Sequence, residues 1–312
     1  MTLKTFIQIS DIHISDYNYD AEALALYAIL PKMDGFLGHS YKSLTLLASF
    51  FLDMVQQEDA ELIITGDVTR VGGVREFDTA RTYLEDELIP PHGNYVGLRN
   101  RDALKLAIPG NHDHYPGIPI LVGGPTAGLS AMFPQMGTIV NMPLGTAGHE
   151  LRFMLVNTDA DVNPWGYNRW LARGSFVSQL DALGKRLPPQ GAKEIRVLCL
   201  HHSRAHRGVT LEMDEVSRDA LANFIVEHGV AMLLSGHIHH PPLVTRATAV
   251  HSLGHSAEYL EARCGTTTQR NLYHVPYYWR RLLAKVQPKN RYHRSEERRV
   301  EKECRSRWSP YH

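Results

Sequence analysis

Cysteine is scarce in this sequence of 312 residues, which contains only Cys199, Cys264 and Cys304 and no Cys-x-x-Cys pair. This excludes a zinc ribbon or a thioredoxin-like redox motif, and an odd, sparse set of cysteines is typical of a reducing compartment. Cys199 lies in an apolar run, so we predict a buried, inert thiol. The sequence also lacks a long apolar run of about 18 residues and a basic, then apolar, N-terminal signal. We therefore expect a cytoplasmic protein with no membrane partner.

An excess of charge of either sign is also missing, because 33 Lys and Arg balance 33 Asp and Glu. A chain without net charge has no global attraction for nucleic acid or for an anionic membrane, so no nucleic-acid partner is expected. The exception is local: Arg291–Arg307 is crowded with Arg, Lys and Glu. We interpret residues 288–312 as a charged tail that is disordered or non-native, which leaves residues 1–287 as one domain.

Short apolar runs that end abruptly in polar residues are abundant. They are Leu3–Ile9, Glu61–Thr65, Ala103–Ile108, Ile195–Leu200 and Ala231–Ser235. Such runs predict strands buried on both faces. Segments with helical periodicity lie between them, namely Ser43–Gln57, Glu76–Leu88, Ser175–Leu187 and Glu215–His228. This alternation predicts βαβ units, whose ligands bind beyond the carboxyl ends of the strands, so the five polar clusters are expected to meet at one edge.

Three further segments complete the predicted organisation. Leu151–Asn157 and Leu243–Val250 are predicted to form additional strands. Tyr115–Pro143 is rich in glycine and proline, which predicts a long loop or cap element near the site. The sequence leaves open whether this segment, or the distal edge of the sheet, forms a lid or a contact in a homodimer.

The polar residues that follow the apolar runs are candidate metal ligands: Asp11, His13, Asp67, Asn111, His201, His237 and His239. This mixture of carboxylate, imidazole and amide suits Mn, Fe or Zn, and the lack of cysteine argues against a structural zinc site. Seven ligands are too many for one tetrahedral ion but suit two ions that share a carboxylate. In Asp-x-His and His-x-His the side chains are two residues apart, so on an extended backbone they would point to the same side.

Glycine precedes the polar residues at Gly66, Gly110 and Gly236, where it would permit a sharp turn at the end of a strand. Each motif alone also fits an ordinary polar turn. The prediction therefore depends on all five clusters occurring together, each after a predicted strand.

The ordered set of motifs resembles the calcineurin-like metallophosphoesterases over roughly residues 4–255. The matching motifs are Asp11-x-His13, Gly66-Asp67, Gly110-Asn111-His112-Asp113, His201 and Gly236-His237-x-His239. The resemblance implies an α/β fold, a four-layer α/β/β/α sandwich in which two mixed sheets pack face to face. Within the family the chain looks most similar to the small bacterial branch that includes cyclic-nucleotide and glycerophosphodiester phosphodiesterases.

The resemblance also implies a role for each matching residue. Asp11, His13 and His239 would bind one metal ion, Asn111, His201 and His237 would bind a second, and Asp67 would bridge them. His112 would face the substrate phosphate and either stabilise charge or protonate the leaving oxygen, and Asp113 would orient it. A hydroxide generated by the metals would attack phosphorus.

Residues close to the motifs are candidates for contacts to the substrate: Asn111, His112, His114, Tyr115, Arg204 and His240. Arg204 stands in a basic stretch with His206 and Arg207, where many phosphodiesterases of the family have proline. A solvated basic loop is the alternative for this stretch, and we favour it slightly. Asn157 and Gly174 also match the family, but loosely.

Together these features predict a phosphodiesterase that acts on a small phosphate ester. A phosphomonoesterase is the alternative, because the same two metals serve both reactions. A nuclease is less favoured, because the chain lacks net positive charge. A non-catalytic binding module is less favoured because every ligand position and His112 are filled.

Overall fold

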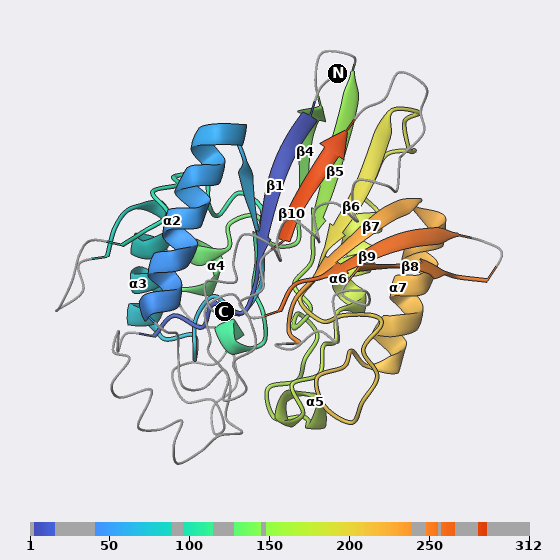
Figure 1. Cartoon of the computed structure of the whole chain (residues 1–312). Helices are drawn as coiled ribbons and strands as arrows, with labels where there is room; N and C mark the ends of the chain where they lie inside the picture. Colours follow the sequence, from blue (N-terminus) through green and yellow to red (C-terminus); the bar gives the residue numbers. More distant parts are fainter. Residues whose placement is uncertain are drawn as a thin grey trace, which may run out of the picture.

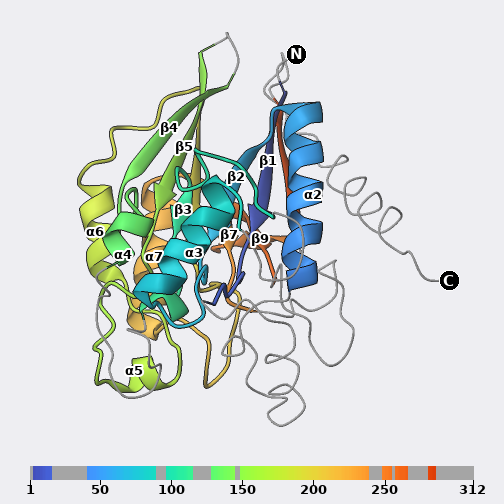
Figure 2. The same cartoon turned by 90° about the vertical axis from the view of Figure 1, so that its left-hand side faces the viewer.

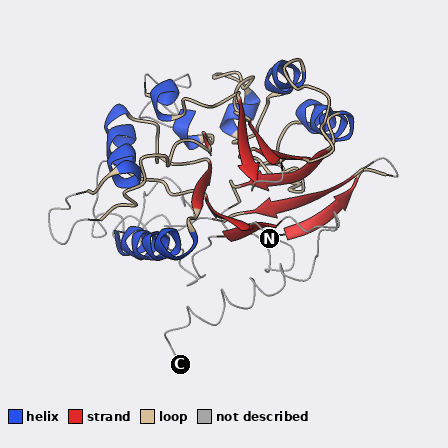
Figure 3. Cartoon of the chain, turned by 90° about the horizontal axis from the view of Figure 1, so that it is seen from above, coloured by secondary structure: helices blue, strands red, loops and turns tan. Residues whose placement is uncertain are grey.

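The computed structural model describes residues 3–15, 41–88, 96–114, 128–144, 148–238, 248–254, 257–265 and 280–285. Two β-sheets pack face to face, and helices cover the outer face of each sheet (Figure 1). The view from above shows the sheets between the two groups of helices (Figure 3). This confirms the predicted four-layer α/β/β/α sandwich of two mixed sheets.

The first sheet contains four strands in the order β10-β1-β2-β3. They are β1 (Leu3–Ile9), β2 (Glu61–Thr65), β3 (Ala107–Ile108) and β10 (Arg280–Lys285). β1, β2 and β3 are parallel, whereas β10 is antiparallel to β1. The helices of this half are α2 (Tyr41–Glu58), α3 (Val74–Glu85) and α4 (Leu129–Met132). Figure 2 shows α2 and α3 in front of this sheet.

The second sheet contains six strands in the order β4-β5-β6-β7-β9-β8. They are β4 (Ile139–Leu144), β5 (His149–Leu155), β6 (Glu194–Cys199), β7 (Val230–Ser235), β8 (Thr248–Ser252) and β9 (Glu258–Arg263). The central strands β5, β6, β7 and β9 are parallel, and the two edge strands β4 and β8 run antiparallel to them. α6 (Val177–Gly184) and α7 (Glu215–Glu227) cover the outer face.

Three apolar layers hold the sandwich together, and alternation along each strand distributes the side chains between them. In β2, Ile64 joins the layer beneath α2 and α3, whereas its neighbour Ile63 joins the layer between the sheets. In β6, Leu198 packs under α6 and α7, and Val197 faces the first sheet. Because both faces of these strands are covered, most of their residues are apolar, as predicted, although β6 also contains the buried Arg196.

Most predicted elements are found within a few residues of their expected positions, but Ala103–Ile108 is different. Only Ala107–Ile108 is a strand, and residues 101–106 form turns. β3 is the edge strand of the first sheet and pairs with β2 through Ala107 and Ile108 alone. Leu104 and Leu106 are buried all the same. The apolar run therefore predicted the burial of these side chains correctly, but it did not predict their backbone conformation.

The predicted long loop Tyr115–Pro143 is also corrected in part. Residues 115–127 lie outside the described residues, but the remainder contains α4 and most of β4, which pairs with β5 along its whole length. Pro143 is compatible with this strand because β4 is at the sheet edge, where one side needs no hydrogen-bond partner. The predicted strand Leu243–Val250 is described only from Thr248.

The predicted tail, residues 288–312, lies outside the described residues. In the part of the chain that the structure describes, every helix is too short or too polar to span a bilayer.

Candidate metal centre

The loops that follow β1, β2, β3, β6 and β7 come together at one edge of the sandwich. Main-chain hydrogen bonds join them, from Asp11 N to Gly66 O at 3.0 Å and from Gly236 N to His201 O at 3.0 Å. The side chains carried by these loops are all buried: Asp11, His13, Asp67, Asn111, His112, His201 and His237. Six of the seven ligands predicted from the sequence are therefore gathered in one place. His239 lies outside the described residues.

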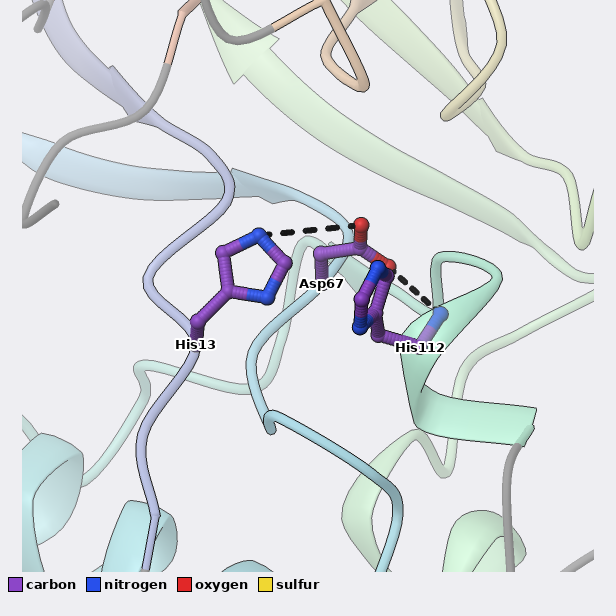
Figure 4. Close-up of side chains that lie close together, drawn as sticks. All are labelled: His13, Asp67 and His112. Atoms are coloured by element: carbon purple, nitrogen blue, oxygen red, sulfur yellow. Dashed lines mark hydrogen bonds and ion pairs between the residues drawn. The ribbon is translucent and has the colours of Figure 1, made fainter. Parts of the chain in front are cut away.

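Asp67 is the central side chain of this cluster. Its Oδ1 atom accepts a hydrogen bond of 2.8 Å from the main-chain N–H of His112. Its Oδ2 atom lies 3.2 Å from Nε2 of His201 and 3.9 Å from Nε2 of His13. Figure 4 shows the carboxylate between His13 and His112. One carboxylate oxygen thus faces imidazoles on two sides, which is the position expected of a bridging ligand.

Three donor atoms, from His201, Asn111 and His237, lie together on one side of Asp67. Nε2 of His201 lies 3.2 Å from Oδ1 of Asn111 and 3.0 Å from Nδ1 of His237. Nδ1 of His201 lies 2.7 Å from the carbonyl oxygen of Thr65, which can only accept, so Nδ1 carries the hydrogen. In the neutral ring, Nε2 then presents its lone pair to the oxygens of Asp67 and Asn111.

This arrangement favours an added positive charge. Burial alone would lower the pKa of His201, but the Asp67 carboxylate outweighs it and raises the pKa to about 10. Burial likewise opposes ionisation of Asp67, yet the surrounding histidines, His201 first, hold the pKa of its carboxyl well below the usual range. A metal ion supplies the same positive charge, and a set of two imidazoles, an amide oxygen and a carboxylate fits Mn, Fe or Zn.

A second group of donors lies on the other side of Asp67. Nε2 of His13 is 3.9 Å from Oδ1 of Asp11, and potential ligand atoms of His13, Asp67 and His112 lie within 4.8 Å of one another. The rings of His13 and His112 meet edge to face, with centroids 4.6 Å apart. His112 therefore lies next to the predicted first metal site.

The backbone that carries these ligands is strained. Asp11, His13, Asp67 and His237 have φ angles of 53°, 50°, 51° and 69°, in a region that non-glycine residues rarely occupy. The extended backbone predicted for Asp11 and His13 is therefore wrong, although both side chains reach the same site. Strain of this kind persists where the surrounding structure enforces it, typically at functional sites.

The glycines before the ligands are required by close packing as well as by the turn. Gly66 has a φ of +101°, and a Cβ there would lie 2.3 Å from Nδ1 of His201. A Cβ on Gly110 would lie 2.2 Å from Oδ1 of Asp67, and one on Gly236 would lie 1.9 Å from Oγ of Ser10. Each glycine therefore lets two loops of the site approach one another.

Replacing Gly236 by alanine is expected to destabilise the protein by about 1–3 kcal/mol, the cost of overpacking a well-packed interior. The added Cβ would also lie 2.9 Å from Oδ2 of Asp11 and would displace a predicted metal ligand. Thermal unfolding and metal content should both fall. Gly191→Ala is the matched control, because its Cβ would lie 3.7 Å from the nearest atom. Equal stability of the two variants would refute the packing argument.

Asp113 does not contact the ring of His112 as the resemblance implied. Its carboxylate accepts hydrogen bonds from the main chain of Thr69 and Gly110 and from the Thr69 hydroxyl, at 2.7–2.9 Å. Nδ1 of His112 lies instead 2.7 Å from the carbonyl oxygen of Arg70. Asp113 thus joins the loops after β2 and β3. Burial, together with the nearby Asp67, raises the pKa of Asp113 to about 7.

The residues predicted to contact the substrate are only partly brought together. Asn111, His112 and His114 lie at the cluster, and His114 Nε2 is 3.0 Å from Oδ1 of Asn157. Arg204 donates a hydrogen bond of 3.1 Å from its guanidinium to the Tyr259 hydroxyl. Its main-chain N–H bonds to Glu261, so these contacts hold it against β9. Tyr115 and His240 lie outside the described residues.

Sequence reasoning missed several groups at this site. The carbonyl oxygens of Thr65 and Arg70, which fix the histidine rings, leave no signal in a sequence. The buried residues Asp159 and Arg169 belong to no recognised motif. The sequence marks His202 only as the neighbour of His201, yet its ring centroid lies 4.2 Å from that of His237.

Comparison with known proteins agrees with this geometry. The family model of calcineurin-like phosphoesterases matches residues 4–241. The chain belongs to this family, and it is therefore classed as a metallophosphoesterase, a hydrolase of phosphate esters. A search of the curated proteins gives no match.

Several solved structures are similar to this chain. TT1561 of Thermus thermophilus is 14% identical, with a TM-score of 0.41, over 85% of this chain and 91% of that protein. GAP50, the anchor in the inner membrane complex of Plasmodium, is 13% identical, with a TM-score of 0.39, over 89% and 78%. A predicted phosphoesterase from Streptococcus pneumoniae is 12% identical, with a TM-score of 0.29, over 91% and 85%.

Proposed function

We propose that this protein is a phosphodiesterase that uses two metal ions to hydrolyse a small phosphate diester. The observation that carries the proposal is the buried Asp67 carboxylate, whose Oδ2 atom faces His201 on one side and His13 on the other. A single carboxylate oxygen between two sets of nitrogen and oxygen donors suits a pair of ions. Manganese, iron and zinc are the metals that these donors favour.

Each metal would be held by residues from several strand ends. The first set is Asp11, His13 and His239, the second set is Asn111, His201 and His237, and Asp67 belongs to both. Two ions bound there would activate water and offset charge on the phosphoryl oxygens. The protein supplies the positions of the ligands, which the strained loops after β1, β2 and β7 fix before any substrate arrives.

His112 is the proposed proton donor to the leaving oxygen. Its Nδ1 atom carries the hydrogen that points to the Arg70 carbonyl at 2.7 Å, so exchange with the substrate would occur at Nε2. In the protonated ring, Nε2 would pass its proton to the leaving alkoxide. Water adds to phosphorus and the P–O bond breaks, which yields a phosphate monoester and an alcohol.

The choice of a diester rests on the motif pattern, which resembles that of the small bacterial phosphodiesterases. Hydrolysis is therefore expected to be faster for bis(p-nitrophenyl) phosphate than for p-nitrophenyl phosphate. The measurement is release of p-nitrophenol by the manganese-loaded protein, with and without EDTA. Chelation should abolish the activity, because metal ions held by Asp67 and its neighbours are proposed to activate the attacking water.

The two substrates distinguish the main alternatives. Faster hydrolysis of the monoester would replace the proposal with a phosphomonoesterase. Activity that survives complete removal of metal would rule out the proposed site as its source. A metal-loaded protein that is inactive on both substrates would contradict the proposed hydrolysis of phosphate diesters and direct the search to a non-catalytic role.

A further inference from the structure

A group of buried residues outside the predicted ligand set contacts the turn that carries Asn111 and His112. Oδ1 of Asn157 lies 3.0 Å from Nε2 of His114, at the end of this turn. Nη1 of Arg169 lies 3.5 Å from the carbonyl oxygen of Asn111, at its beginning. The turn is thus contacted at both ends by the segment between β5 and α6, which belongs to the other half of the sandwich.

Asp159 connects these two contacts. Its main-chain N–H donates a hydrogen bond of 3.0 Å to Oδ1 of Asn157, and its Oδ2 atom accepts one of 3.1 Å from Arg169. We name Asn157, Asp159 and Arg169 the Asp159 cluster. The exposed fractions of its members are only 6%, 5% and 9%. A charge-assisted hydrogen bond in so buried a place is strong and geometrically demanding, so it fixes the Arg169 guanidinium relative to the turn.

The same segment also contacts a histidine beside the predicted second metal site. The Thr158 hydroxyl lies 2.7 Å from Nδ1 of His202, whose Nε2 atom donates to the Ala172 carbonyl at 3.1 Å. Because both ring nitrogens are bonded, the plane of His202 is fixed. Its ring packs on that of His237, with centroids 4.2 Å apart. Residues 157–172 therefore contact the main chain of Asn111 through Arg169 and support the ring of His237 through His202.

We infer that the Asp159 cluster positions the second metal site, the one formed by Asn111, His201 and His237 with Asp67. Its members act through the ligands they orient, so they are positioning residues and not catalytic ones. The inference depends on the two-metal arrangement of the proposed function, but not on the choice of substrate. Residues that orient metal ligands typically contribute about 10–100-fold to metal affinity.

The test is the number of manganese ions bound per chain, measured by equilibrium dialysis and elemental analysis without any substrate. Asp159→Asn and Arg169→Met are expected to weaken the second site by about 10–100-fold and leave the first unchanged. At a concentration where the original protein holds two ions, the variants should hold one. Arg169→Lys keeps the positive charge but loses the planar guanidinium with its several N–H donors. It should therefore retain only part of the manganese affinity of the second site.

Arg173→Met is the matched control, because Arg173 lies in the same segment but pairs with Glu212 at 2.8 Å. It should retain two ions. Asn157→Ala removes no charge, so it provides a test even if Asp159→Asn and Arg169→Met fail to fold. It should show a smaller loss of manganese affinity at the second site. The inference is overturned if Arg169→Met and Asp159→Asn bind two ions with unchanged affinity. It is also overturned if every folded variant loses affinity at both sites alike.

These results separate the inference from the proposed function. An original protein that binds two ions but cleaves no diester would refute the phosphodiesterase and leave the inference testable by metal count. An original protein that never binds a second ion would refute both.

Discussion

Replacing Asp67 by asparagine is expected to remove at least one metal ion and to lower the rate of ester hydrolysis by at least about 10²–10³-fold, the cost of losing one preorganised electrostatic group. Oδ1 of Asp67 accepts the main-chain N–H of His112 at 2.8 Å, so the amide oxygen of asparagine must occupy this position. The amide NH₂ then replaces Oδ2, which lies 3.2 Å from His201 and 3.9 Å from His13. An uncharged NH₂ group would then occupy the position where two metal ions are predicted to share a carboxylate oxygen.

Metal content and kcat should be measured on the same preparation of Asp67→Asn. Asp161→Asn is the control, since it makes the same chemical change at an exposed carboxylate that accepts a hydrogen bond of 2.8 Å from Ser178 N. The control should keep both metals and its rate. Full occupancy of both sites in Asp67→Asn would contradict the bridging role.

Replacing His112 by alanine is expected to lower kcat by about 10²–10³-fold while both metal ions remain bound. The carbonyl of Arg70 orients the ring through Nδ1 at 2.7 Å, and the side chain is 7% exposed. The ring is therefore held in one orientation, with a small part of the residue exposed. Loss of the proposed proton donor should slow the chemical step, and it should leave the binding of the substrate largely unchanged.

The metal count decides between two roles for His112. Because its ring lies next to that of His13 and within the same group of donors as Asp67, it stands where a ligand could also stand. If His112→Ala loses a metal ion together with its activity, His112 is a ligand and the proposed proton transfer is wrong. His206→Ala serves as the control, because that ring lies in another loop, 3.3 Å from the Thr210 carbonyl.

The α/β alternation and the predicted ligands could be read from the sequence because both depend on local pattern. Strands such as β2 and β7 are covered on both faces, so they appear as short runs of mainly apolar residues. The ligands follow directly after these strands, so Gly66-Asp67 and Gly236-His237 are visible as short motifs. The apolar run Ala103–Ile108 was a poor predictor of a strand, because burial of Leu104 and Leu106 does not require strand conformation.

By itself, then, the sequence determined which side chains are available for a metal centre and the order in which the strands deliver them. The tertiary structure alone decided how those side chains are held. The Arg70 carbonyl takes the place predicted for Asp113, and positive φ angles replace the extended backbone predicted for Asp11 and His13. Arg169 reaches Asn111 across 58 positions of the chain. Contacts made by main-chain atoms and by distant segments arise only when the two halves pack, and for that reason local sequence pattern does not encode them.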